Sequence, residues 1–345
     1  MSHFYRAYGL ILRSQKPIQG LSPLPPEDDP SSHQDQVSIF IGEPQAWVNA
    51  ALRLAVQPIY VTAGWDGVAD PALEVAELGD GEFFRFSYLD GTRFVVDAAM
   101  QRIWGTCPAS LTQEDLVTYL VGPVLGFVLR RRGVLALHAS TFCSNGLAFV
   151  LCGEGGAGKS TTAAALALRG VPIQCEDITA VRERAGGLWV APGYPRVNLW
   201  PESVSSVFSM PKALPKITPN WEKQFLSLDG KLAEFEKLDR QLAAVYLLAP
   251  RRQEDRAPRI EEISSREAVL QLVQNTYMNY LLGAKQREME FDAIARLVSR
   301  FVVRRLIPHS DPTKLSMMCD LLQVDSANIA RTMGGAPRVS VHDRR

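Results

Sequence analysis

The sequence predicts an α/β fold in which a β-rich amino-terminal accessory domain precedes a core of alternating strands and helices. The first part reads as short strands and turns, including a strand at 8–12 and a hairpin at 82–96. After residue 112, apolar strand-like runs alternate with helix-forming runs, which is the pattern of α/β domains. A glycine-rich loop at 153–160 joins one of these strands to one of these helices.

We expect three parts along the chain: the accessory domain at 1–110, the core domain at 111–310, and a carboxyl-terminal helix with a disordered basic tail at 311–345. A chain of 345 residues is long enough to bury more than one apolar core. A capping box is predicted at 112–115, ahead of an apolar run. This run is too short to span a bilayer and contains Pro123, so it predicts a buried helix.

Composition and charge exclude several classes of partner. Lysine plus arginine and aspartate plus glutamate both total 37, so no broad electrostatic attraction to nucleic acid or to an anionic membrane is expected. The five cysteines lack the spacing of a zinc site, and Cys152 and Cys175 lie in apolar runs typical of a core. The first residues lack the pattern of a secretory signal. We therefore expect a cytoplasmic protein that binds neither nucleic acid nor membrane.

The glycine-rich loop carries the strongest functional signal. It matches the pattern GxxxxGK[ST] over Gly153, Glu154, Gly155, Gly156, Ala157, Gly158, Lys159 and Ser160. Such glycines let successive backbone N–H groups face phosphate oxygens, and the N-terminus of the following helix adds unpaired donors. We therefore predict that this loop and Thr161 bind the phosphates of ATP or GTP. Lys159 is expected on the terminal phosphates and Ser160 on Mg²⁺.

Two adjacent carboxylates follow the next predicted strand. Glu176 and Asp177 end the apolar run at 171–175, so both lie at the carboxyl edge of the predicted sheet, where open α/β folds bind ligands. In an extended strand their side chains point in opposite directions, which predicts different roles. His138 lies on the strand before the loop strand, and we expect it to orient or tune Glu176 through a hydrogen bond. Ser140 faces the same side as His138.

Two basic residues are weaker candidates. Arg196 lies in the run at 194–201, where it is a candidate to stabilise the transferred phosphoryl group or to grip an acceptor. Trp200 in the same run can equally be a core residue. Lys231 follows the turn Asp229-Gly230 and is the weakest of these candidates.

The order of these motifs resembles the HPr kinase/phosphorylase family. In that family a strand with a histidine, a phosphate-binding loop, a helix ending in an Arg-Gly-like pair and a strand ending in two acids follow one another. Here they are His138, the loop at 153–160, Arg169-Gly170 and Glu176-Asp177, within residues 130–250. The resemblance implies a P-loop kinase core of the HPr-kinase type, with ATP and Mg²⁺ as cofactors, and it is compatible with a homo-oligomer.

Carried across position by position, the resemblance implies a role for each site residue. His138 and Glu176 match the family's catalytic pair, with Glu176 as the base that takes the proton of an acceptor serine. Asp177 and Ser160 would then hold Mg²⁺. Arg196 remains a further catalytic candidate.

The sequence departs from the family pattern in three respects. The first acid is glutamate rather than aspartate, the run at 195–201 replaces a glycine-rich segment, and the first 110 residues differ from the family's amino-terminal domain. With these departures and with the residues at 5–10, the sequence is more similar to the HPr-kinase-like enzymes of peptide biosynthesis. These enzymes include kinases that phosphorylate a serine of lasso-peptide precursors. The expected function is therefore transfer of the terminal phosphoryl group of ATP to a serine hydroxyl of a peptide or small protein.

Two alternatives remain open at this point. The first is a P-loop kinase that acts on a small-molecule alcohol held by the accessory domain. The second is a nucleotide-sensing regulatory protein, although the chain contains neither a guanine-reading Asn-Lys-x-Asp motif nor a Leu-Ser-Gly-Gly run.

Overall fold

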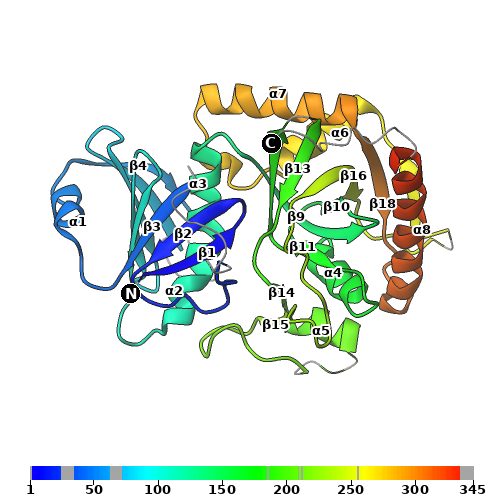
Figure 1. The fold of residues 1–345 in the computed structure, drawn as a ribbon, viewed down its shortest axis with the longest axis horizontal. Coiled ribbons are helices and arrows are strands. Elements are labelled where there is room, and N and C mark those ends of the chain that lie inside the picture. Colours follow the sequence, from blue (N-terminus) through cyan, green and yellow to red (C-terminus); the bar gives the residue numbers. More distant parts are fainter. Residues whose placement is uncertain are drawn as a thin grey trace, which may run out of the picture.

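The computed structural model describes residues 2–24, 35–62, 72–184, 186–208, 210, 213–254 and 256–334. Within these residues the chain forms two large sheets, one from each part of the sequence, with helices between and around them (Figure 1). A mixed α/β fold, as predicted, is therefore confirmed. The tail that we expected to be disordered, residues 335–345, lies outside the described residues.

Several strands of the first sheet alternate buried and half-buried side chains, whereas others are buried or exposed along most of their length. Its strands are β1 (His3–Ala7), β2 (Leu10–Ser14), β3 (Gln36–Ile41), β4 (Val56–Val61), β5 (Leu73–Leu78), β6 (Phe83–Tyr88), β7 (Arg93–Asp97) and β8 (Arg102–Thr106). Their order is β1-β2-β3-β8-β7-β6-β5-β4. The predicted hairpin is confirmed as β6 and β7, and alternate residues on one face bury Phe84, Phe86 and Phe94. Helix α1 (Ala46–Ala51) covers a separate cluster around Trp104.

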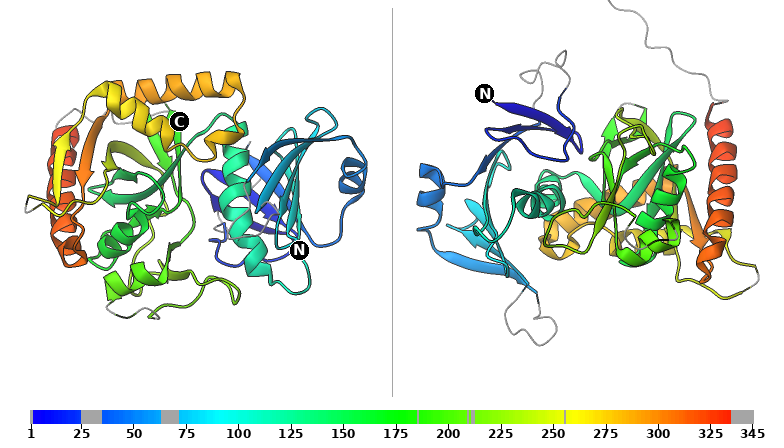
Figure 2. Two further views of the ribbon diagram at one scale, coloured as in Figure 1. Left: turned by 180° about the vertical axis from the view of Figure 1, so that it is seen from behind. Right: turned by 90° about the horizontal axis from the view of Figure 1, so that it is seen from below.

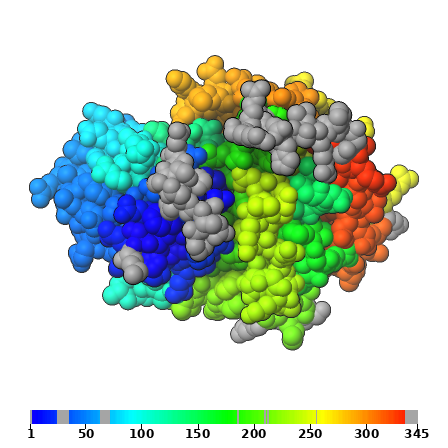
Figure 3. Space-filling model, in the orientation of Figure 1, coloured from blue at the N-terminus to red at the C-terminus, as the bar shows by residue number. Residues whose placement is uncertain are grey.

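The single strand predicted at 8–12 is wrong, because the chain reverses there. Tyr8 and Gly9 have φ angles of 56° and 75°, the left-handed values of a tight hairpin turn, and they connect β1 to β2. The tip of this hairpin rests on the second part of the chain, since the Tyr8 N–H donates to the carbonyl of Pro192 at 2.6 Å. Figure 3 shows the blue surface of these strands bordering the green surface of the second part.

A bent helix lies between the two sheets. It consists of α2 (Gln113–Tyr119), the π-helical turn η2 (Leu120–Val124) and α3 (Leu125–Arg131), with Pro123 inside the π-helical turn. The predicted capping box is confirmed, because Thr112 and Asp115 exchange side-chain-to-backbone hydrogen bonds at the start of α2. The predicted buried helix is also confirmed, and its apolar residues belong to the same core cluster as the first sheet.

The second sheet brings three parallel strand ends to one edge. It contains β9 (Leu135–Ser144), β10 (Leu147–Cys152), β11 (Ile173–Cys175), β12 (Ile178–Arg184), β13 (Gly187–Ala191), β16 (Arg240–Leu248), β17 (Arg259–Glu262) and β18 (Val302–Ile307). Strand β16 pairs in parallel with both β10 and β18. The segments that follow these three strands therefore meet at the same edge, which is where parallel sheets bind ligands.

Helices cover both faces of this sheet (Figures 1 and 2). On one face, α4 (Lys159–Ala167) and α8 (Leu315–Gly334) share an apolar cluster. On the other face, α6 (Ser265–Gln274) and α7 (Ala284–Arg300) pack over a second cluster. The predicted carboxyl-terminal helix is present as α8, and a short turn, η4 (Pro312–Lys314), precedes it.

A small third sheet lies beside the loop edge. It pairs β14 (Arg196–Leu199) with β15 (Gln224–Ser227). Helix α5 (Pro201–Phe208) lies between these two strands in the sequence. Cys152 and Cys175 are buried, as predicted for core residues. Among the helices that the structure describes, none combines the length and apolarity needed to cross a bilayer.

Candidate active site

The glycine-rich loop connects β10 to α4 at the parallel edge of the second sheet, as the strand–loop–helix pattern predicted. Gly156 and Gly158 have φ angles of 78° and 106°, a left-handed conformation that only glycine adopts without strain. A Cβ at Gly155 or Gly156 would meet nothing within 4 Å, so these two exposed positions of the loop border open space rather than packed side chains. Thr161 lies in the first turn of α4, where its hydroxyl contacts that of Ser203 at 3.0 Å.

Lys159 folds back under this loop. Its Nζ donates to the carbonyl oxygens of Gly153 and Glu154 at 2.7 and 2.9 Å, and the residue is only 6% exposed. Burial lowers the pKa of the Lys159 ammonium, since these hydrogen-bond partners are neutral carbonyls. The loop therefore holds a desolvated positive charge at its centre.

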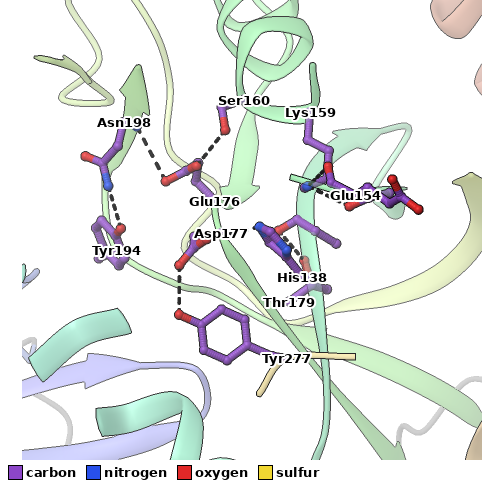
Figure 4. Close-up of polar contacts among 12 residues, drawn as sticks. His138, Glu154, Lys159, Ser160, Glu176, Asp177, Thr179, Tyr194, Asn198 and Tyr277 are labelled. Atoms are coloured by element: carbon purple, nitrogen blue, oxygen red, sulfur yellow. Dashed lines mark hydrogen bonds and ion pairs between the residues drawn. The ribbon is translucent and has the colours of Figure 1, made fainter. Parts of the chain in front are cut away.

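Glu176 is buried beside the start of α4. Its carboxylate accepts a hydrogen bond from the Ser160 hydroxyl at 2.8 Å and a longer one from the backbone N–H of Asn198 at 3.4 Å (Figure 4). Burial and the neighbouring charge of Asp177 raise the pKa of Glu176 to about 7, although the hydrogen bond from Ser160 opposes this rise. Glu176 therefore titrates near neutral pH.

Asp177 points away from Glu176 because the chain turns sharply at this residue. Its φ is 66°, and the N–H of Ile178 donates to the carbonyl of Glu176 at 2.8 Å, which forms a γ-turn. One carboxylate oxygen, Oδ2, accepts a hydrogen bond from the Tyr277 hydroxyl at 3.0 Å (Figure 4). The other, Oδ1, lies 3.5 Å from Nε2 of His138. The two acids thus have different surroundings, as predicted.

His138 pairs with Asp177, so the expected hydrogen bond between His138 and Glu176 is wrong. The left-handed turn at Asp177 is the physical reason, because it directs the second acid, not the first, toward β9. Burial lowers the pKa of His138, and the charges of Lys159 and Lys223 act in the same direction while Asp177 opposes them. The neutral form of the imidazole is therefore favoured at neutral pH.

Ser140 is buried on the same strand as His138. Within the described part of the chain, its hydroxyl has no hydrogen-bond partner. The side chain faces the same side of β9 as His138, as the alternation of the strand requires.

Arg196 lies next to this cluster rather than in it. Its guanidinium stacks over the rings of Tyr194 and Phe225, with centroid distances of 5.3 and 5.6 Å, and lies within 3.0 Å of the place of a Cβ on Gly20. It lines a groove between the first part of the chain and the small sheet, together with Thr112. Arg196 is therefore placed at a boundary between the two parts of the chain.

Two other residues of the weaker predictions lie at the surface. The side chain of Lys231 is 86% exposed and lies 3.8 Å from Asp229, so it points to solvent rather than into the site. Trp200 is 52% exposed, which rules out the core position considered for it, and Nζ of Lys223 lies 5.0 Å from its ring centroid.

The fold brings three further residues to the site that were not predicted as site residues, and Asn198 and Tyr277 are two of them. Asn198 donates its backbone N–H to Glu176 and its side-chain amide to the hydroxyl of Tyr194, at 2.8 Å. Tyr277 reaches Asp177 from the segment after α6. Only Asn198 carried a signal, since it lies in the run at 194–201 that also contains Arg196.

Cavities flank the loop on both sides. One lies between the first turn of α4 and the segment 308–315, and it is lined by Gly158, Thr161 and Arg251 among others. The other opens beside residues 153–157, between the ends of β16 and β18 and helix α6. Arg251 borders both cavities, and its guanidinium lies 3.4 Å from the place of a Cβ on Gly158. It is the third residue that the sequence did not indicate.

The donors at this site suit a hard cation only in part. Within the described residues, no group of three or more His, Cys, Asp or Glu side chains is arranged to hold a metal ion. The Ser160 hydroxyl and the Glu176 carboxylate nevertheless stand together beside the loop, and oxygen ligands of this kind fit Mg²⁺. Mg²⁺ commonly uses one or two protein ligands and completes its shell with phosphate oxygens and water, so this donor set fits that cation.

Comparison with known proteins gives limited information. No protein-family model and no curated protein sequence matches the chain. Among solved structures, the HPr(Ser) kinase/phosphatase from Coxiella burnetii is similar, with a TM-score of 0.30 and 12% sequence identity. The match covers 58% of this chain and 94% of that one.

Proposed function

We propose that the protein is an ATP- and Mg²⁺-dependent kinase that transfers the terminal phosphoryl group to a serine hydroxyl of a peptide or small protein. The observation that carries this proposal is the convergence of Lys159, Glu176 and the Asp177–His138 pair at one edge of the sheet. The buried ammonium of Lys159 can bind the negative charge of a triphosphate. Because Glu176 and Asp177 have different surroundings, one carboxylate can bind a metal ion while the other accepts a proton.

The loop would hold the phosphates of the nucleotide. Its backbone N–H groups and those of the first turn of α4 supply donors and the positive end of a helix dipole. Lys159 would exchange the carbonyls of Gly153 and Glu154 for phosphate oxygens, which compensate its buried charge better than neutral partners do.

Ser160 and Glu176 would hold Mg²⁺. Their hydrogen bond already places both oxygens together, and Glu176 with a pKa of about 7 gains its charge when a cation is present. When bound, Mg²⁺ supplies positive charge that neutralises the phosphates and orients the terminal one. This assignment differs from the sequence prediction, in which Asp177 was the partner of Ser160.

Asp177 and His138 would then accept the proton. Glu176 is almost fully buried and already accepts two hydrogen bonds, whereas the Asp177 side chain is 35% exposed and can be reached by an acceptor hydroxyl. As the serine oxygen bonds to the terminal phosphorus, the bond from that phosphorus to the bridging oxygen breaks. The serine proton passes to Asp177 with His138 beside it, and ADP leaves.

The nucleoside would occupy the cavity beside Arg251. The terminal phosphates must face Glu176 and Asp177, so the other end of the nucleotide extends past Thr161, and the cavity between α4 and 308–315 lies there. We expect Arg251→Ala to weaken ATP binding about tenfold while inorganic tripolyphosphate binding changes less than twofold. Calorimetry with both ligands tests this, with Arg252→Ala as the neighbouring control. Equal weakening of both ligands would instead place Arg251 on the phosphates.

The acceptor would enter through the groove that contains Arg196. This groove lies between the first part of the chain and the small sheet, so an accessory domain there can select the acceptor. The order of the sequence motifs supports a serine in a peptide, including the precursor of a lasso peptide, as the acceptor class. Arg196→Ala is expected to raise the KM for the peptide without changing ATP binding.

The decisive experiment is a transfer assay with radiolabelled ATP, Mg²⁺ and a panel of serine-containing peptides, each paired with its alanine analogue. Transfer to the serine peptides alone supports the proposal. Phosphorylation of small alcohols but not peptides favours the small-molecule alternative, and tight nucleotide binding without any transfer favours a nucleotide sensor. Glu176→Gln should raise the Mg²⁺ requirement, whereas Asp177→Asn should lower kcat. If Glu176→Gln instead lowers kcat and Asp177→Asn raises the Mg²⁺ requirement, Glu176 is the base and Asp177 the Mg²⁺ ligand, as predicted from the sequence.

A further inference from the structure

Tyr277 is a buried side chain that contacts the catalytic pair without belonging to it. Its hydroxyl donates to Oδ2 of Asp177 at 3.0 Å, and its ring meets that of His138 edge-on, with centroids 6.1 Å apart. Burial and the charge of Asp177 raise the pKa of the Tyr277 phenol well above its ordinary value. The hydroxyl therefore stays protonated at neutral pH and remains a donor to Asp177.

The bent helix between the sheets packs closely against the Tyr277 ring. A Cβ on Gly126 would lie 2.4 Å from Cε1 of the ring, and one on Gly122 would lie 3.5 Å from its hydroxyl and 3.9 Å from Oδ2 of Asp177. The backbone is fixed as well, because the Tyr277 N–H donates to the carbonyl of Ala136 on β9 at 2.9 Å. The ring is thus held between α3 and the strand that carries His138.

The hydrogen bond also decides which oxygen of Asp177 remains available. Because Tyr277 occupies Oδ2, only Oδ1 is left to face His138. The γ-turn fixes the backbone at Asp177 but not the plane of its carboxylate, which can still rotate about the Cβ–Cγ bond. The hydrogen bond from the Tyr277 hydroxyl therefore sets the orientation of the Asp177 carboxylate.

We propose that Tyr277 is a positioning residue that holds Asp177 in the orientation required for proton transfer, and that the bent helix fixes Tyr277 in turn. This inference rests on the proposed kinase activity. It also gives the first part of the chain a connection to the site, because the apolar residues of the bent helix and of the first sheet form one core cluster. In the part of the chain that the structure describes, the Tyr277 hydroxyl hydrogen-bonds to Asp177 and not to the loop or to the donors proposed for Mg²⁺.

The test combines Tyr277→Phe with Asp177→Asn. Tyr277→Phe keeps the ring and removes only the donor, so we expect kcat to fall about 10- to 100-fold while the KM for ATP changes less than twofold. In the Asp177→Asn background the same substitution should cause no further loss, because it acts through Asp177. Tyr280→Phe is the matched control, since Tyr280 stacks on Tyr60 instead, with centroids 4.1 Å apart.

Each outcome of this cycle decides the inference. An unchanged kcat in Tyr277→Phe, or an equal loss in both backgrounds, would overturn the positioning role while leaving the kinase proposal intact. Absence of transfer by the wild-type protein would overturn both. Gly126→Ala gives a second readout, because its methyl group displaces the ring. It should reproduce the kcat loss of Tyr277→Phe with nucleotide affinity unchanged, and normal kcat in a folded Gly126→Ala protein would contradict the inference.

Discussion

Two buried carboxylates, one in each part of the molecule, behave in opposite ways. Asp115 lies at the start of α2 beside the first sheet, and Glu176 lies at the edge of the second sheet. Both are shielded from water, yet the pKa of Asp115 is lowered and that of Glu176 is raised to about 7. Burial alone therefore does not distinguish a structural acid from a functional one.

The difference lies in the number of donors around each acid. Burial raises the pKa of Asp115, but hydrogen bonds from Thr112, Thr218 and Asn220 outweigh it. Glu176 has the Ser160 hydroxyl and one long backbone bond, and it also faces the charge of Asp177. The first region stabilises the charge of Asp115 with several donors, most of them on Oδ2, whereas the second region leaves more of the stabilisation of Glu176 to a ligand.

Among the substitutions that distinguish the two regions, Lys159→Ala is expected to have the largest effect, which is a loss of activity without a loss of stability. Phosphoryl transfer should fall at least about 1,000-fold, because the cation that faces the phosphates is lost. Stability without nucleotide should not fall, since the buried ammonium is desolvated and its partners are neutral carbonyls. Transfer assays and thermal unfolding of the same preparation measure both. A large drop in melting temperature would show that the Lys159 ammonium stabilises the fold. The contrast between a structural charge in the first region and a ligand-binding charge in the second would then be wrong.

Asp115→Ala should give the converse result. It removes the acid of the capping box and leaves the donors of Thr112 and Asn220 without their partner, so the free energy of unfolding should fall by about 2–3 kcal/mol at neutral pH. The folded pKa of Asp115 is depressed, so its contribution is present above the unfolded pKa and is lost as the pH falls through the folded pKa. Urea unfolding measures the loss, and kcat per folded molecule should be unchanged.

Local sequence signals predicted the elements that local chemistry determines. The capping box at 112–115, the hairpin of β6 and β7, and the passage from β10 through the glycine-rich loop to α4 each depend on neighbouring residues. The convergence of His138 with the acids was also expected, because the strands that carry them follow one another along the chain.

Contacts set by single backbone turns or by distant segments were not predictable. The partner of His138 depends on the left-handed turn at Asp177, and an aspartate permits such a turn without requiring it. The hairpin of β1 and β2 was missed in the same way, because the chain reverses at left-handed residues that lie within an apolar run. Tyr277 and Arg251 reach the site from segments far along the chain, where no motif or periodicity marks them.

The smallest effect in this comparison is a pH-dependent gain in stability from Glu176→Gln. The folded pKa of this acid lies above its unfolded value, so the native state binds the extra proton, and wild-type stability falls as the pH rises from about 4 to 7. Glutamine has no such loss. The variant should therefore match the wild type near the acid end of this range and exceed it by on the order of 3 kcal/mol or less at pH 8.

Denaturant unfolding at intervals between pH 5 and pH 8, without nucleotide or Mg²⁺, tests this expectation, with Glu288→Gln on the exposed face of α7 as the control. A stability difference that does not change with pH would mean that Glu176 is charged in the native state throughout, as Asp115 is. The two acids would then be equivalent, and the distinction between a self-compensated first region and a ligand-dependent second region would lose its main support. A difference that grows with pH and disappears when Mg²⁺ and ATP are added would instead identify the ligand that completes the site.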